Sequence, residues 1–260
     1  MNTEFLKVNT KAILVFLFLN TFTLSYAQTT DSPKTEYHFS GSIGATNNGI
    51  SFIPTFSLGK PAAIFTMSVG SKKLSFEPEL RTSLEGKPWS LVLWGRYKMI
   101  NDAKWKVNIG ARPAIAFKTV ITDLSGIPKN TILAQRYLAA SISSAYFLTK
   151  DISIGSDCLF ARGIDEGTIH NTNFLTLNTS FSNIKIAKEF ALQLTPQLYY
   201  LKMDTKDGYF FSSALTLTKK NTPLSISAMM NKIIKTDINT KNFVWNATLA
   251  YSFNTKFTKQ

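Results

Sequence analysis

The 260-residue sequence predicts an all-β fold: a closed antiparallel transmembrane β-barrel of about 12 strands, with 10 or 14 left open. Three observations predict it. Segments of about ten residues alternate apolar and polar side chains, the signature of strands with one face toward lipid. Tight turns alternate along the chain with longer connections, as periplasmic turns alternate with extracellular loops in membrane barrels. Beyond the first thirty residues, no apolar run approaches the roughly 20 residues of a membrane-spanning helix.

The amino terminus has the layout of a secretory signal peptide. Basic residues precede a short apolar run over residues 12–19, and Ser25 and Ala27 place small side chains before a cut at position 28. We therefore expect residues 1–27 to be cleaved and the protein to be exported. An uncleaved anchor is the alternative, although the apolar run is short for one.

The barrel itself is predicted over residues 50–253, and a C-terminal tail over 254–260. Residues 28–49 are expected to be a lead-in segment that can supply one extra strand, or extend the first strand past a bulge at Asn48-Gly49. The longest irregular connection is expected near residues 123–130. In chain order, the expected strands cover residues 50–58, 63–69, 74–84, 89–99, 105–118, 138–148, 152–160, 169–186, 190–200, 209–217, 224–230 and 243–253.

Two folds fit this alternation, and they differ in whether the apolar side chains point into the protein or out toward lipid. In a soluble periplasmic β-sandwich or lipocalin-like barrel the apolar parity would point inward, whereas in a membrane barrel it meets lipid. The charged opposite parity and the aromatic residues near segment ends favour lipid. These aromatics are Trp89, Trp105, Tyr146, Tyr200, Tyr209 and Phe253. Prolines at positions 54, 78, 113 and 196 lie inside expected strands and count against a membrane barrel. We interpret them as bulges or near-interface positions.

The leader, the alternation over residues 50–253 and the runs Phe76–Arg81 and Thr195–Tyr200 carry a family resemblance. The chain resembles small outer-membrane β-barrel proteins of the Bacteroidetes type. The resemblance implies a location in the cell outer membrane and a barrel architecture, and it implies no substrate and no functional residue. The expected partners are outer-membrane lipids and the barrel-assembly machinery.

The candidate site is the charged parity of the strands between residues 74 and 118. With the hairpin centred between Gly86 and Lys87, Glu77 faces Arg96 and Glu79 faces Trp94 across the ladder. Inward cations exceed inward carboxylates by 6 − 2 = +4 over these strands. The predicted lumen-lining residues are Glu77, Glu79, Arg81, Trp94, Arg96, Lys106, Arg112 and Lys118.

Two functions fit these residues. One is a narrow channel that selects small anionic solutes by sign. The other is a structural barrel whose salt-bridge network plugs the lumen. The competing class, tied to the soluble fold, is a periplasmic or surface binding protein.

Enzyme, metal and nucleic-acid functions find little support. An outer-membrane lipid hydrolase is the enzymatic alternative, but His38 and His170 are the only histidines and neither belongs to a recognisable triad. These histidines and the single Cys158 lack metal-ligand spacing. No cofactor-binding fingerprint occurs, and the basic residues are dispersed rather than clustered as in nucleic-acid-binding faces. We predict no catalytic residue, cofactor, metal or nucleic-acid partner.

Overall fold

A computed structural model describes residues 36–124 and 127–258. The predicted signal peptide, residues 1–27, lies outside the described residues. Within this part of the chain, no helix is long and apolar enough to cross a membrane.

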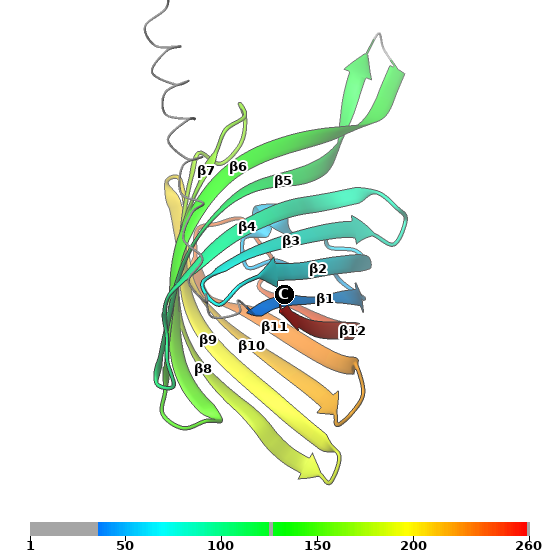
Figure 1. Cartoon of the computed structure of the whole chain (residues 1–260). Helices are drawn as coiled ribbons and strands as arrows, with labels where there is room; N and C mark the ends of the chain where they lie inside the picture. Colours follow the sequence, from blue (N-terminus) through cyan, green and yellow to red (C-terminus); the bar gives the residue numbers. More distant parts are fainter. Residues whose placement is uncertain (1–35, 125–126, 259–260) are drawn as a thin grey trace, which may run out of the picture. The chain divides into compact units, whose positions relative to one another are not determined.

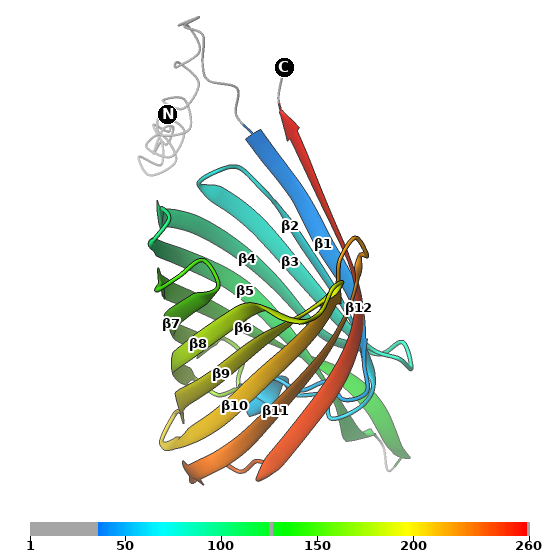
Figure 2. The ribbon, with the colours of Figure 1, turned by 90° about the horizontal axis from the view of Figure 1, so that it is seen from below.

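Twelve antiparallel strands form a closed barrel in which each strand pairs with its sequence neighbours and β1 pairs with β12 (Figures 1 and 2). The predicted fold class and strand number are therefore confirmed. The strands are β1 (Glu36–Thr46), β2 (Ala62–Gly70), β3 (Leu74–Ser83), β4 (Pro88–Asn101), β5 (Trp105–Leu124), β6 (Ile127–Phe147), β7 (Ile152–Gly163), β8 (Asn171–Ala187), β9 (Phe190–Met203), β10 (Lys206–Lys219), β11 (Leu224–Thr236) and β12 (Phe243–Thr258).

The first strand is not the predicted one. Residues 36–46, expected as part of a lead-in that could supply one extra strand, form β1 and pair with both β12 and β2. Residues 50–58, expected as a strand, lie in the β1–β2 connection with a short 3-10 helix, η1 (Pro54–Phe56). Proline has no N–H for a ladder and is pre-set for the first turn of a helix, and Gly59 takes a positive φ of 72°. The predicted number of strands is nevertheless correct, because residues 36–46 take the place of residues 50–58 as the first strand.

Two strands and the carboxyl end run further than predicted. The connection expected near residues 123–130 is mostly strand, since β5 and β6 pair up to Leu124↔Ile127. β-branched residues on both arms, such as Val120, Ile121 and Ile132, favour extended backbone. The predicted tail is also largely strand, because β12 pairs with β1 up to Thr258.

Three of the four prolines predicted inside strands do lie in strands, and they are not bulges. Pro78, Pro113 and Pro196 each pair normally with one neighbouring strand. Toward the other neighbour the ladder is interrupted for two residue pairs, and the register is the same on both sides of the gap. The missing N–H therefore locally opens one ladder and inserts no extra residue.

The two ends of the barrel differ in their connections. At the turn end, tight turns cover residues 71–73, 102–104, 148–151, 188–189 and 220–223, as predicted. At the loop end lie the connections 47–61, 84–87, 164–170, 204–205 and 237–242. The loop predicted over residues 204–208 is wrong, because only residues 204–205 separate β9 from β10. In membrane barrels the short turns are usually periplasmic and the longer loops extracellular, and this asymmetry predicts the same orientation here.

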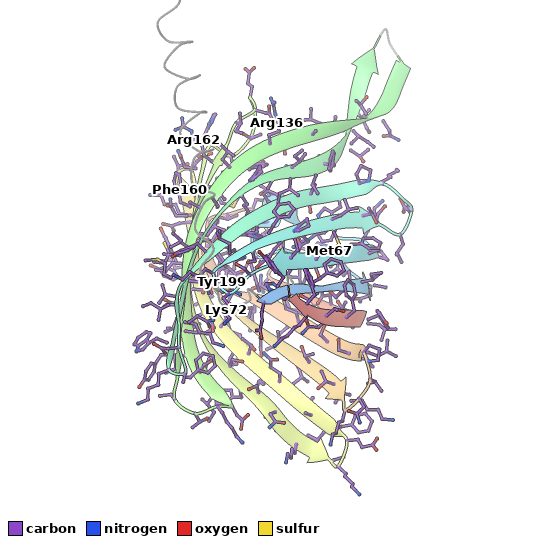
Figure 3. All side chains as sticks on the ribbon, in the orientation of Figure 1. Met67, Lys72, Arg136, Phe160, Arg162 and Tyr199 are labelled. Carbon is purple, nitrogen blue, oxygen red and sulfur yellow. The ribbon has the colours of Figure 1, made fainter. Side chains whose placement is uncertain are left out.

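The outer wall is apolar. Large apolar side chains alternate along every strand with their exposed faces outward, as in Phe65, Met67 and Val69 of β2. Figure 3 labels Met67 on this strand. Aromatic pairs lie near its two ends: Trp105 with Tyr146, and Tyr200 with Tyr209. Soluble monomers rarely expose an apolar surface this continuous, whereas lipid requires one. Closed backbone pairing and an apolar exterior make this an outer-membrane β-barrel.

Candidate functional site

The charged parity of β3, β4 and β5 faces the lumen and forms what we call the charged wall. Inward and outward side chains alternate along these strands, so the apolar residues between them face out. The charged wall consists of Glu77, Glu79, Arg81, Trp94, Arg96 and Arg112, which are six of the eight residues predicted from the sequence.

The predicted register of the β3–β4 hairpin is wrong by two residues. Trp94 pairs with Glu77, and Arg96 pairs with Ser75. The register shifts at Arg81/Thr82, because the connection of residues 84–87 is not the symmetric turn we assumed. The predicted meeting of Glu77 and Arg96 nevertheless occurs diagonally: Arg96 Nε donates to Glu77 Oε2 at 2.7 Å. Ser75 Oγ donates to the other carboxylate oxygen at 2.7 Å.

Two arginine guanidinium groups lie against the Trp94 ring. The guanidinium carbon of Arg96 lies 4.1 Å from the Trp94 ring centroid, and that of Arg112 lies 4.4 Å from it. Trp94 is the aromatic side chain best suited to such cation–π contacts. On the same wall, Arg81 forms an ion pair with Glu79 and stacks 4.9 Å from the Trp89 centroid.

Arg112 differs from the other two arginines of the charged wall. Arg81 and Arg96 are paired with carboxylates, but no carboxylate of the described residues lies within ion-pair distance of Arg112. Its Nε is buried and has no hydrogen-bond partner among the described residues. Arg112 is thus a partly buried cation whose charge is balanced only at longer range.

Lys106 and Lys118 do not join this cluster. Lys106 lies toward the turn end, with Nζ 4.7 Å from the Phe147 ring. Lys118 lines a cavity of about 580 Å³ near the loop end, together with Lys60, Glu85 and Lys87. A further carboxylate, Asp157, projects from β7 and accepts a 3.4 Å hydrogen bond from Thr176 Oγ1.

A polar cavity of about 490 Å³ adjoins the charged wall. Glu77, Glu79, Trp94 and Arg96 lie on one side of it. Hydroxyl groups from β12, β1 and β2 lie on the other side: Ser40, Ser42, Thr66, Ser68 and Ser252. The cavity therefore combines charged groups with neutral hydrogen-bonding groups, and Met67, Pro78 and Phe253 add an apolar part to its lining.

The opposite side of the lumen is apolar and packs against the β1–β2 connection. We call it the aromatic wall: Phe174, Tyr199, Leu201 and Phe210. The Tyr199 and Phe210 rings stack at 4.8 Å, and Phe52 of the connection lies 5.5 Å from Tyr199 and 6.0 Å from Phe174. Ile53 of the same connection is also buried in this cluster. Residues 47–61 therefore occupy part of the lumen.

The β1–β2 connection is fixed to the charged side as well. Trp89 Nε1 donates to the Phe56 carbonyl oxygen at 2.7 Å, and Phe56 packs 5.0 Å from the Tyr137 ring. Trp89, expected among the interfacial aromatics, is only 2% exposed and faces inward. Gly49 permits this packing, because a Cβ there would lie 2.9 Å from the Trp89 ring.

Sequence reasoning missed the aromatic wall and the inserted connection. A signal was present: Tyr199 and Phe210 are large aromatics on the parity assigned to water. Pro54 and the Gly59-Lys60-Pro61 turn were a second signal, because they leave little room for a ladder.

The histidines stay apart from these walls. His38 Nε2 lies 3.1 Å from Ser68 Oγ, and His170 is exposed in the 164–170 connection. In the described part of the chain, no group of three or more His, Cys, Asp or Glu side chains is arranged to hold a metal ion. Cys158 is exposed on the outer wall.

No protein-family model matches the sequence, and no curated protein matches it either. Solved structures with a similar chain path include a KdgM porin in complex with disordered oligogalacturonate, with a TM-score of 0.48 and 9% identity over 83% of this chain and 99% of that chain. A NanC porin has a TM-score of 0.46 and 13% identity over 85% of this chain and 100% of its own. An outer-membrane channel from Pseudomonas putida F1 has a TM-score of 0.45 and 9% identity over 89% and 98%. Similarity this low carries no substrate or activity across to this chain.

Proposed function

We propose that this protein is a narrow outer-membrane channel for small anionic solutes. The observation that carries the proposal is Arg112, a partly buried lumenal guanidinium with no carboxylate at ion-pair distance among the described residues. A buried cation without a direct counterion is costly, and a passing anion lowers that cost. The guanidinium fork suits carboxylates and phosphates.

Other features support anion passage along the charged wall. Lys106 and Lys118 lie toward the two ends of the lumen, so an anion meets a lysine on either side of the arginines. The count of +4 from the sequence overstates the selectivity at the centre. There, Glu77, Glu79 and Asp157 offset the three arginines of the charged wall. We therefore expect mild rather than strict anion preference.

The second candidate function is a structural barrel with a plugged lumen. The β1–β2 connection favours it, because Phe52, Ile53 and Phe56 fill space between the aromatic wall and the charged wall. The soluble binding protein of the sequence analysis is disfavoured by the apolar outer wall. The absence of catalysis and the Bacteroidetes-type origin remain predictions.

Fractionation and single-channel recording test the proposal. We expect the protein to copurify with the outer membrane and to shift in gel mobility on boiling. In planar bilayers under a salt gradient, we expect small conductance steps and a reversal potential of anionic sign. Arg112→Gln should reduce the anion preference, whereas Lys232→Gln, on the outer wall, should leave it unchanged. A silent insertion refutes the channel and favours the plugged barrel.

A further inference from the structure

A groove crosses the outer wall over β3 to β7. Its floor and walls come from one row of residues that pair across neighbouring strands: Phe76 with Gly95, Gly95 with Ala111, Ala111 with Ala140 and Ala140 with Phe160. Three small residues thus form a floor between two phenylalanine walls. We call this feature the outer groove.

The outer groove is open to the surroundings and apolar. Two adjoining cavities of about 610 and 1080 Å³ share Gly95, Ala111, Ala140 and Phe160. Leucine, isoleucine and proline side chains of the neighbouring rows surround the floor, including Leu93, Pro113 and Leu138. Such a lining fits a hydrocarbon chain and no polar solute.

The larger cavity ends at a cation. Arg162 lies two residues after Phe160 on the same outward parity, next to the loop end, and His170 lines the cavity beside it. Figure 3 labels Phe160, Arg162 and Arg136 along the same part of the wall. Arg136 forms an ion pair with Asp165, whereas Arg162 is exposed and forms no ion pair within the described residues.

We infer that the outer groove binds a phosphorylated glycolipid of the outer leaflet, lipid A, with an acyl chain along the floor and a phosphate on Arg162. An exposed arginine at the edge of an apolar band is favourable where an anionic headgroup meets it. At the loop end, which faces outward from the cell, lipid A supplies that phosphate. The inference rests on the proposed outer-membrane location.

A second copy of this barrel is the less favoured occupant. Among residues whose side chains the structure describes, the carboxylates away from strand ends are Glu77, Glu79 and Asp157, and all three face the lumen. At the loop end, Asp207 of β10 pairs across the ladder with Lys202 and accepts a hydrogen bond from the Tyr200 hydroxyl at 2.9 Å. Another copy would have to draw Asp207 from these partners, whereas a lipid phosphate satisfies both the groove and the cation.

The test uses the full-length mature barrel, purified in detergent, with its fold verified by gel mobility before and after boiling. Bound lipid is counted by native mass spectrometry during titration with lipid A, with lipid A stripped of its phosphates, and with phosphatidylglycerol. We expect lipid A to be retained, and the dephosphorylated form to bind about tenfold more weakly, the loss of roughly one charge-assisted hydrogen bond. Phosphatidylglycerol should also bind more weakly than lipid A, and equal binding overturns the assignment to the glycolipid.

Three variants separate the headgroup from the chain. Arg162→Gln should lower affinity for lipid A to that of the dephosphorylated lipid, and Arg162→Lys should restore part of it. Ala140→Leu, or Ala111→Leu if the first folds poorly, should weaken both forms by filling the floor. Lys232→Gln is the matched control, because it removes an outward charge that lines no groove.

Two further results overturn the inference. One is equal affinity of wild type and Arg162→Gln for lipid A. The other is a detergent-stable dimer that Ala140→Leu dissociates, which would assign the groove to a second copy. A barrel that fractionates with the outer membrane but ignores the phosphate refutes this site alone, whereas failure to fractionate there refutes the proposed function.

Discussion

The charged wall and the aromatic wall face each other across one lumen and are built on the same period-two pattern. On the charged wall, two arginines are paired with carboxylates, and the Arg96–Glu77 side chains remain 27% and 30% exposed. On the aromatic wall, Leu201 and Phe210 are 0% and 1% exposed and pack against the β1–β2 connection. The comparison indicates that one side of the barrel supplies packing stability, while the other keeps polar groups available to a solute.

The largest expected effect tests the aromatic wall. Phe210→Ala removes a fully buried ring stacked on Tyr199, and we expect a loss of about 3–5 kcal/mol in the free energy of unfolding. Urea titration of the barrel in lipid vesicles measures it. Phe243→Ala, which truncates a lipid-facing ring, is the control and should cost clearly less. Equal losses would contradict the idea that packing is concentrated on the aromatic wall.

The next effect tests the charged wall. Glu77→Gln removes the partner of Arg96, and we expect a loss of about 1–2 kcal/mol because the pair is only partly buried. The lost negative charge should also move the reversal potential toward stronger anion preference. Glu189→Gln breaks an exposed turn ion pair with Lys219 and should change neither quantity noticeably. An unchanged reversal potential in Glu77→Gln would place the ion path elsewhere.

A third, smaller effect tests how the two walls are joined. Trp89→Phe keeps a ring beside the β1–β2 connection but loses the hydrogen bond to the Phe56 carbonyl, at a cost of about 1 kcal/mol. Loosening the connection should increase open-channel current fluctuations. Trp105→Phe, on the outer wall, is the matched substitution and should leave the current trace as in wild type. If the two variants give the same current fluctuations, the β1–β2 connection does not shape the ion path through the lumen.

The smallest effect lies outside both walls, at the loop end. Hydrogen bonding from the Arg136 guanidinium holds the pKa of Asp165 below its usual value. A carboxyl whose pKa is lower in the folded state stabilises the fold above its unfolded pKa, and this stabilisation is lost as pH falls through the folded pKa. Asp165→Asn should therefore lower the melting temperature slightly at pH 7 and not at all once the pH is below the lowered pKa of Asp165 in the folded state. A difference that persists in acid would exclude this charge as its cause.

Much of the architecture could be predicted because alternation acts locally. The apolar residues Leu74, Phe76 and Leu80 of β3 alternate and specify its outward face, and the opposite parity specifies an inward face, whatever the neighbouring strand does. The charged-wall residues were found in this way. The meeting of Glu77 with Arg96 was predicted from an assumed register that places them directly opposite, whereas they meet diagonally. Their register could not be found in this way, because it depends on the geometry of the connection at residues 84–87 and on the shift at Arg81/Thr82.

The sequence by itself determined a β-barrel with an apolar outside and a charged inner face, since a period of two needs only the pleat of the strand. Tertiary structure alone decided which segments became strands and what filled the lumen. Residues 50–58 alternate as a strand does, yet they pack Phe52 and Ile53 against the aromatic wall. That choice depends on the space left inside a closed barrel, and on rings from β8, β9 and β10 that become neighbours only when the barrel closes.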